Sequence, residues 1–552
     1  MMRWFGQLLP PFRRTRSSHS GGGSTAGTRR GLRRGDELTG SLSRRVADNL
    51  SLIRELFGDS VDLISRGLGG SAGQPWLGIV YLEPLVDADL VNRCVLMPLV
   101  DKVKENGPVE GIGQLHDLLP IGRLAELDQI GDLMTHLLSG YTIILLEGAA
   151  AFAVSTIGGE KRSVDEPTSQ TVTRGPKESF TESLLTNMTL LRRRLKSPDL
   201  RVEGFTIGRR TRTFVNMVYM EGIAAPGPVK EIRRRLGRID VDSILDSGYI
   251  EEFIQEERWT PFPTIQNTER PDAASAGLLE GQIAVVVDGS PFVLLAPSTF
   301  VKFFQSSEDY YQRYDISSFL RMIRYICFFV SILLPSLYIA VTTFHQEMLP
   351  TPLLISLASQ REGVPFPALV EALLMELTFE VLREAGVRMP RVVGPAISIV
   401  GALVLGQAAV QAGLVSAAMI IVVSFTAIAN FVIPSVNMAA GARLIRFVLM
   451  LVGGTLGLFG IMCGLMVMVV HLVSLKSFGI PYMTPLAPLV WNNLKDVWIR
   501  VPWPLMKTRP TLPRTEAAGG QGDVRRQAEG SEADSHANSA SREPETNSNS
   551  ER

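Results

Sequence analysis

The sequence predicts a membrane α-helical bundle of four to six transmembrane or re-entrant helices. A cytoplasmic α/β region of two tandem, internally duplicated subdomains precedes it. Two observations predict this fold, and a third narrows the function. The last part of the 552-residue chain contains three long stretches without charged residues. The region before them repeats its own sequence pattern. Acidic and basic residues are equal in number, 55 of each, which argues against a protein that binds nucleic acid by bulk charge.

Residues 1–45 are expected to form a disordered basic arm. This segment holds ten arginines, opposed only by Asp36 and Glu37, and a glycine-rich run. Its prolines and arginines replace the apolar core and cleavage site of a signal peptide. The arm either touches anionic lipid or is a solvated tail. Residues 508–552 are rich in Ser, Asn, Glu and Gly and are expected to form a second disordered tail.

Residues 46–320 mix helix and strand patterns and repeat themselves. An ordered series of matches holds one offset of 138 residues. The matched pairs are Asn49 with Asn187, Gly70 with Gly208, Trp76 with Phe214, and Val80 with Val218. We therefore expect one α/β subdomain over 46–140 and a second over 141–320, in each of which a helix, a strand, further helices and a hairpin follow one another.

Each copy is expected to contain a hairpin turn made by an acidic residue and a glycine. The pairs are Glu147 with Gly148, and Asp288 with Gly289. Apolar runs flank both pairs, and the turn requires a positive φ that glycine adopts without strain. Equivalent helices are expected over 46–57 and 178–195. The second ends in Arg192 and two further arginines, which either bind phosphate or lipid or complement the helix dipole.

Stretches without Asp, Glu, Lys or Arg define a transmembrane domain over residues 321–475. They cover 325–346, 392–442 and 447–475. A membrane crossing needs about 20 apolar residues, so the longest stretch is expected to cross twice. The expected spans are about 325–344, 392–413, 417–434 and 447–472.

Arginines before the first span place the N-terminal region in the cytoplasm. Arg391 precedes the next charge-free stretch and is therefore also expected in the cytoplasm. For Arg324 and Arg391 to share that side, the segment Pro365–Leu382 between them must cross back. Five passes would leave the C-terminus outside, whereas Lys495 and Arg500 in the membrane-proximal segment 476–507 favour the inside. The side of the C-terminus therefore stays open.

Three acids, Glu371, Glu376 and Glu380, interrupt the otherwise apolar segment that crosses back. A carboxylate at the bilayer centre costs at least ~2.5 kcal/mol, so it is expected to face protein or water. At about 100° per residue, Glu376 and Glu380 share one helix face and Glu371 points elsewhere. All three are candidates for an ion pathway, with Glu376 and Glu380 lining it between subunits. The alternative is an amphipathic helix on the membrane surface, with its acids in water.

The last span carries four glycines, Gly453, Gly457, Gly460 and Gly464, which give two G-x-x-x-G spacings. Such spacings let helix backbones approach each other closely. We therefore expect this span to pack against another helix. The alternative is a glycine-rich helix that faces lipid.

No catalytic, cofactor-binding or metal-binding residue is assigned, and an enzyme is not expected. Phosphate-binding and dinucleotide-binding motifs are absent. The three cysteines, Cys94, Cys327 and Cys463, are too scattered for a disulfide framework or a zinc site. The six histidines lack the spacing of metal ligands.

Segments between residues 140 and 475 resemble the A subunits of the GerA-type spore germination receptors (GerAA, GerBA and GerKA). They include Arg174-Gly-Pro-Lys-Glu-Ser, Pro261-Phe-Pro-Thr, Val287-Asp-Gly-Ser-Pro-Phe, Phe344-His-Gln-Glu-Met and Leu382-Arg-Glu-Ala-Gly. The resemblance implies a multi-pass protein of the spore inner membrane in a sporulating bacterium. It also implies a homo-oligomer in contact with membrane lipid, with a transporter-like B subunit and a lipoprotein C subunit as partners.

The resemblance further implies nutrient sensing, with the A subunit as the ion-conducting, signal-transducing part. A sister group, the stage V sporulation AF-type accessory proteins, shares this layout, but the segment Asp288-Gly-Ser-Pro-Phe favours the receptor subunit. The remaining alternative is a non-conducting membrane scaffold. Charged residues inside the bilayer favour the channel, because a scaffold has no need of them.

Overall fold

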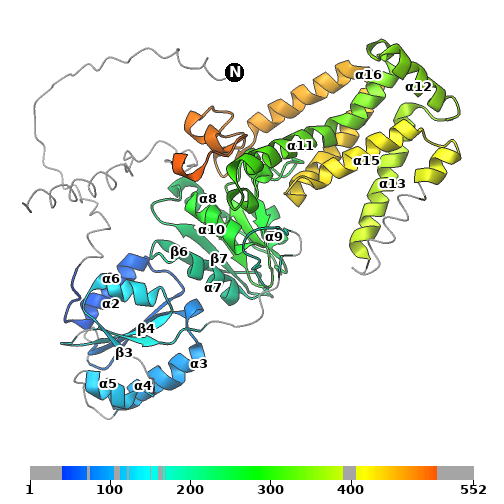
Figure 1. The fold of residues 1–552 in the computed structure, drawn as a ribbon. Coiled ribbons are helices and arrows are strands. Elements are labelled where there is room, and N and C mark those ends of the chain that lie inside the picture. Colours follow the sequence, from blue (N-terminus) through cyan, green and yellow to red (C-terminus); the bar gives the residue numbers. More distant parts are fainter. Residues whose placement is uncertain are drawn as a thin grey trace, which may run out of the picture.

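The computed structural model describes residues 40–506 except 71–74, 105–111, 121–123, 150, 159–165, 168–169, 390–403 and 405. Figure 1 shows two sheet-containing subdomains and a helical domain that extends away from them. Most of the expected basic arm and the whole of the expected tail lie outside the described residues.

The first subdomain begins with helix α2, which is followed by a five-stranded sheet and its helices (Figure 1). In chain order its elements are α2 (Val46–Phe57), β1 (Leu63–Leu68), β2 (Leu77–Leu82), α3 (Ala88–Val91), η2 (Asn92–Leu96), α4 (Met97–Lys104), α5 (Ile112–Leu118), β3 (Leu124–Leu127), α6 (Ile130–Leu137), β4 (Tyr141–Leu146) and β5 (Ala151–Ser155). Those of the second are α7 (Leu184–Arg194), β6 (Leu200–Ile207), β7 (Thr213–Met220), α8 (Pro226–Leu236), α9 (Ser247–Ile254), β8 (Gln266–Thr268), α10 (Pro271–Leu279), β9 (Ile283–Val287) and β10 (Val293–Ala296).

The two subdomains share one topology. The strand order is β1-β2-β4-β5-β3 in the first sheet and β6-β7-β9-β10-β8 in the second. All neighbouring strands are antiparallel. Each strand of one sheet has its counterpart, in the same chain order, in the other. The expected internal duplication is therefore confirmed.

The expected boundary between residues 140 and 141 is wrong. Strands β4 and β5 follow that boundary but belong to the first sheet, where β4 lies between β2 and β5. The apolar run of β4 is almost wholly buried, because helices cover both faces of the sheet at this strand. The first subdomain consequently extends through residue 155.

The hairpin acids and glycines have equivalent positions in both subdomains. Gly148 and Gly289 have φ angles of 79° and 86°, the region that glycine occupies without strain. The Glu147 carboxylate accepts a hydrogen bond from the first N–H of α2 at 2.8 Å. Asp288 accepts the equivalent bond from α7 at 3.2 Å. Each hairpin therefore satisfies an orphan donor at the helix that opens its subdomain.

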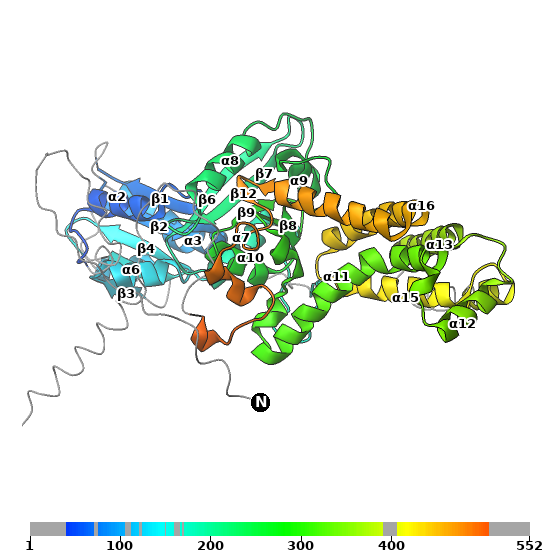
Figure 2. The same cartoon turned by 90° about the horizontal axis from the view of Figure 1, so that it is seen from above.

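Each sheet is covered by helices on both faces, because alternate strand residues point to opposite sides. In the first sheet Ile143 and Leu145 pack with α2 and α6, whereas Ile144 and Leu146 pack on the other face with α4 and α5. In the second sheet α7 and α10 cover one face and α8 and α9 the other. Of these helices, α9 lies beside the start of α16 (Figure 2), where Asn437 is 3.5 Å from Glu251.

Among the residues that the structure describes, the helical domain includes three long helices, a short apolar helix and a surface helix. They are α11 (Tyr314–Thr343), α12 (Thr351–Arg361), α13 (Ala368–Arg388), α15 (Ala417–Phe431) and α16 (Val436–Ser474). Among the described residues α11 and α16 are long and apolar enough to cross a membrane. The expected span 392–413 lies mostly outside the described residues.

Helix α16 is a hairpin of two helices. Gly457 has φ 64° and ψ −147°, which breaks the helix. Thr260 Oγ1 lies 2.9 Å from His471 Nε2 near one end, and Gly441 near the other end contacts the neighbouring Pro261. In one straight helix residues 441 and 471 would be about 45 Å apart. The expectation of a single last span is therefore wrong: the chain reverses at Gly457, and both ends of α16 meet the second subdomain.

The segment after α16 returns to the α/β region. It contains β11 (Lys476–Ser477), β12 (Ile480–Pro481), η6 (Trp491–Asp496) and η7 (Trp503–Leu505). Ser477 Oγ donates to Thr264 O at 2.7 Å, and Tyr482 OH donates to Pro263 O at 2.8 Å. The C-terminal segment 476–506 and the α/β region consequently lie on the same side of the helical domain.

Candidate functional site: buried charges in the helical domain

Helix α13 carries the three acids of the expected ion pathway. Glu371 and Glu376 are fully buried, and the side chain of Glu380 is 19 % exposed. The surface-helix alternative, with the acids in water, is therefore wrong, because the carboxylates face other helices of the same chain.

Glu376 and Glu380 face arginines on the first half of α16. Arg446 Nη2 lies 3.2 Å from Glu376 Oε2 and 3.6 Å from Glu380 Oε1. Arg443 Nε lies 3.3 Å from Glu380 Oε1, and Arg383 Nη2 lies 2.8 Å from Glu380 Oε2. Three guanidinium groups thus surround two carboxylates, and the cluster has a formal charge of about +1.

The pair of Arg446 and Glu376 is close but not hydrogen-bonded. The two side chains are 1 % and 0 % exposed. Within the part of the chain that the structure describes, neither carboxylate oxygen of Glu376 and no guanidinium nitrogen of Arg446 has a hydrogen-bond partner. Buried polar groups rarely lack partners. At this pair, a water molecule, an ion or a shift of α13 would therefore gain several hydrogen bonds.

Glu371 has different partners, as its position around the helix predicts. Its Oε1 accepts hydrogen bonds from Ser416 N at 2.6 Å and from Ser416 Oγ at 2.5 Å. Ser416 is the N-cap of α15, where a negative charge complements the helix dipole. The other Glu371 oxygen lies 4.0 Å from Arg361 Nε. Glu371 therefore joins α13 to the first turn of α15.

The sequence patterns did not predict Arg446 and Arg443 as partners of the acids, because these arginines precede an apolar stretch, as the cytoplasmic flank of a span does. One signal was available: Glu376 and Glu380 are four residues apart and the arginines three, so each pair lies on one helix face. Two oppositely charged faces in neighbouring apolar helices favour an ion-pair cluster.

The four glycines do not form one continuous packing face, because Gly457 is the break in α16. Gly453 lies against α11, whereas Gly460 and Gly464 lie against the first half of α16. A Cβ added at Gly453, Gly460 or Gly464 would lie within 3.2 Å of Ser336 O, Val452 O or Leu449 Cδ2, respectively. Close backbone approach therefore occurs both within the α16 hairpin and between α16 and α11.

A second buried cluster joins the start of α11 to the C-terminal segment. Arg321 is fully buried and donates to Asp496 Oδ1 at 2.8 Å, and its Nη2 lies 3.2 Å from Asp309 Oδ2. Arg324 also donates to Asp309 Oδ2, at 2.8 Å. Tyr310 OH donates to Asp496 Oδ2 at 2.5 Å, and burial together with the Asp496 charge raises the pKa of Tyr310. The cluster fixes the start of α11 to the C-terminal segment.

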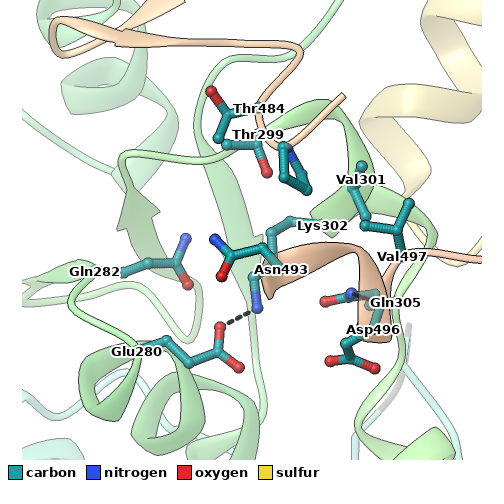
Figure 3. A pocket seen from close by; sticks show the side chains of 11 residues that line it. Glu280, Gln282, Thr299, Val301, Lys302, Gln305, Thr484, Asn493, Asp496 and Val497 are labelled. Atoms are coloured by element: carbon teal, nitrogen blue, oxygen red, sulfur yellow. Dashed lines mark hydrogen bonds and ion pairs between the residues drawn. The ribbon is translucent and has the colours of Figure 1, made fainter. Parts of the chain in front are cut away.

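A cavity of about 50 Å³ adjoins this cluster, between the second subdomain and the C-terminal segment (Figure 3). Lys302 and Glu280 form an ion pair in one wall, and Asn493 belongs to the other. Gln305 Oε1 and Thr484 Oγ1 are buried and have no hydrogen-bond partner among the described residues. The cavity has room for a few water molecules. In the described ranges no group of three His, Cys, Asp or Glu side chains is arranged to hold a metal ion.

Arg192 has a role that neither sequence interpretation anticipated. It is fully buried, and its Nε and Nη2 donate to the two Asp62 oxygens at 2.7 and 3.0 Å. Because Asp62 belongs to the first subdomain and Arg192 to the second, this bidentate pair holds the two subdomains together. The following Arg193 donates to Gly158 O at 2.8 Å.

Comparison with known proteins identifies relatives over most of the chain. Residues 51–512 match the family described as Bacillus/Clostridium GerA spore germination protein. Spore germination protein KA of Bacillus subtilis (strain 168) is 48 % identical over 473 residues, which cover 85 % of this chain and 87 % of that protein. The uncharacterized membrane protein YfkQ of the same strain is 44 % identical over 474 residues, 85 % of this chain and 91 % of that protein.

A solved structure also matches the α/β region in sequence. It is the N-terminal domain of the A subunit of the Bacillus megaterium spore germinant receptor GerK3. The identity is 38 %, the match covers 48 % of this chain and 98 % of that one, and the TM-score is 0.37. From the family match and the long alignments with its relatives, we conclude that the chain belongs to the GerA family of spore germination proteins.

Proposed function

We propose that this chain is the A subunit of a nutrient-sensing germination receptor, that it oligomerises in the membrane, and that it forms the ion-conducting part of the complex. Its partners are further copies of itself, a transporter-like B subunit, a lipoprotein C subunit and membrane lipid. We propose no reaction for the chain, no cofactor and no nucleic-acid partner. The α/β region lies in the cytoplasm and transmits the signal to the helices.

The proposed topology has six crossings of the spore inner membrane. Because the C-terminal segment returns to the α/β region, the number of crossings is even. The crossings are α11, α13, the stretch 392–413, α15 and the two halves of α16. Six crossings put the C-terminus inside, which agrees with the basic residues Lys495 and Arg500.

The observation that carries the channel proposal is the buried Arg446–Glu376 pair. Charged side chains inside apolar helices are expensive and mark ion pathways in many membrane proteins. The pair has unused hydrogen-bonding capacity on both sides, which water or a passing ion would use. Glu376 and Glu380 are proposed to line the pathway when α13 moves away from α16, and Glu371 remains fixed to α15.

The second candidate is a non-conducting scaffold. The specific observation in its favour is that the arginines neutralise the acids within one chain, as a rigid helical frame requires. In a scaffold the Arg446–Glu376 pair only holds α13 against α16, whereas in a channel the pair must separate when the pathway opens.

Current recording in planar bilayers with the purified full-length chain tests the two candidates. The acids are neutralised as Glu376→Gln with Glu380→Gln, and Arg446→Gln is added so that no buried arginine is left unpaired. A pathway lined by these acids predicts changed conductance or ion selectivity at unchanged protein level. A parent chain that carries no current, in the presence of its partner subunits, refutes the channel. Unchanged current in the triple variant refutes only the role of the acids.

A further inference from the structure

We infer that α9 and the residues after it form a lipid-contacting surface that seats the α/β region on an anionic membrane. The inference rests on the proposed function in one respect, that the halves of α16 cross the bilayer. It goes beyond that function because it assigns a membrane contact to the α/β region itself. We name this surface, formed by residues 245–259 with Arg238, the seat.

The seat has an exposed apolar face. Tyr249 and Phe253 are four residues apart on one side of α9 and are 45 % and 43 % exposed. Leu245, just before the helix, is 63 % exposed. Trp259 is 96 % exposed, more than any other large apolar side chain that the structure describes. Tryptophan and tyrosine concentrate where a bilayer meets water, since their rings are both apolar and polar. This composition is typical of a membrane-interface contact.

The seat lies at the depth of the lipid headgroups. Thr260, next to Trp259, contacts His471, and Pro261 O contacts Gly441, so the chain here touches both inner ends of the α16 hairpin. The charge-free run of the first half begins at Phe447, six residues and about 9 Å beyond Gly441. The headgroup layer is about 5–8 Å thick. Gly441 therefore lies at the water-facing edge of the headgroup layer, and an exposed aromatic ring at this level reaches into the headgroups.

The charges beside the apolar face favour anionic lipid. A hollow of about 450 Å³ lies between α8 and the end of α9, and Phe253 belongs to its lining. Arg238 and Arg258 line it, are exposed, and have no side-chain partner within the described ranges. Two acids of the hollow, Asp240 and Glu256, are already paired with Arg209 and Arg235. Two free guanidinium groups beside aromatic rings suit the phosphate of an anionic headgroup.

A second copy of this chain is the competing occupant. Two observations favour lipid instead. The apolar face is continuous with the ends of the proposed membrane-crossing helices. The hollow beside it is locally basic, since Arg234, Arg235, Arg238 and Arg258 line it against Asp240 and Glu256. The exposed acids Glu252 and Glu257 lie outside this lining, so the seat as a whole is not positively charged and the preference for an anionic headgroup belongs to the hollow.

Depth-dependent quenching tests the seat on the full-length chain in proteoliposomes. In a background without the three native cysteines, Tyr249→Cys carries a fluorescent probe, and the lipid carries a spin label at headgroup depth. The vesicles contain phosphatidylcholine with or without phosphatidylglycerol. Met97→Cys, in an exposed position of the first subdomain, is the matched control outside the seat. Met462→Cys, exposed on the second half of α16, reports insertion of the helices.

We expect the probe at 249 to be quenched about twofold or more above the probe at 97. This excess should grow with phosphatidylglycerol and lose that dependence in Arg238→Gln with Arg258→Gln. Equal quenching at 249 and 97 overturns the inference. A probe at 249 that is shielded from water but not quenched by lipid also overturns it, because a second copy of the chain then covers the face. Absent quenching at 462 by lipid labelled at the bilayer centre would instead refute the proposed membrane crossing.

Discussion

Replacing Arg446 by methionine tests how the helical domain holds its buried acids. Arg446 is the only cation that the structure records within 4 Å of Glu376, at 3.2 Å, and the neighbouring Arg443 and Arg383 pair with Glu380. Arg446→Met therefore leaves a fully buried carboxylate without its counter-ion. Breaking a buried ion pair from one side costs about 3–5 kcal/mol. We expect a loss of this size in the free energy of unfolding of the detergent-solubilised full-length chain.

The double variant separates the lost pair from lost packing. Arg446→Met with Glu376→Met replaces both charges by apolar side chains of similar size, and such replacements are often neutral or stabilising. The double variant should therefore be more stable than Arg446→Met alone. Arg388→Met is the control, because Arg388 pairs with Glu384 at the exposed surface of α13 and should contribute at most about 0.5 kcal/mol. If Arg446→Met costs no more than Arg388→Met, the buried pair does not stabilise the domain and the reasoning fails.

Three further predictions concern the fold. Gly457→Ala should destabilise the helical domain by more than about 1–2 kcal/mol, because its φ is 64° and a Cβ would also clash with the end of α11. The control is Gly222→Ala, where φ is 77° but the space is open, so that only the backbone strain remains. Equal shifts in the melting temperature for both variants would contradict the hairpin. Arg192→Met should lower the free energy of unfolding of the α/β region by about 3–5 kcal/mol and expose the linker between subdomains to protease, unless Asp62 finds another partner. Burial beside Asp246 raises the pKa of Glu251 from 4.5 to about 7. The free energy of unfolding should therefore fall by roughly 1–3 kcal/mol as pH rises from 4.5 through 7. Unfolding measured at several pH values should lose this dependence in Glu251→Gln, and an unchanged profile would contradict the role of Glu251.

Local sequence patterns were sufficient to predict the α/β region. The helix over 46–57 and both acid–glycine hairpins follow from short-range periodicity and turn chemistry. The constant offset of 138 residues between matching residues predicted the internal duplication. The wrong boundary at residue 140 has a physical cause. Assigning β4 to its sheet depends on pairing with β2, whose partner residues lie more than 60 positions earlier in the chain.

The helical domain was less predictable, because its long-range contacts decide its topology. The glycines of α16 fit a packing face and a chain reversal equally well by spacing, and only the positive φ of Gly457 distinguishes the two. Likewise Arg446 has the position of a cytoplasmic flank in sequence. Its contact with Glu376 requires α13 and α16 to be neighbours, which hydropathy alone does not specify.

The junction between Arg321 and Asp496 has a consequence for biosynthesis. The two residues are 175 positions apart, so all the apolar helices are synthesised after Arg321 and before its partner. Until residue 496 leaves the ribosome, the arginine at the start of α11 has only Asp309 as a counter-charge. The junction therefore closes last, after the helices have inserted. A nascent or truncated chain that lacks the final segment therefore keeps an incompletely neutralised Arg321.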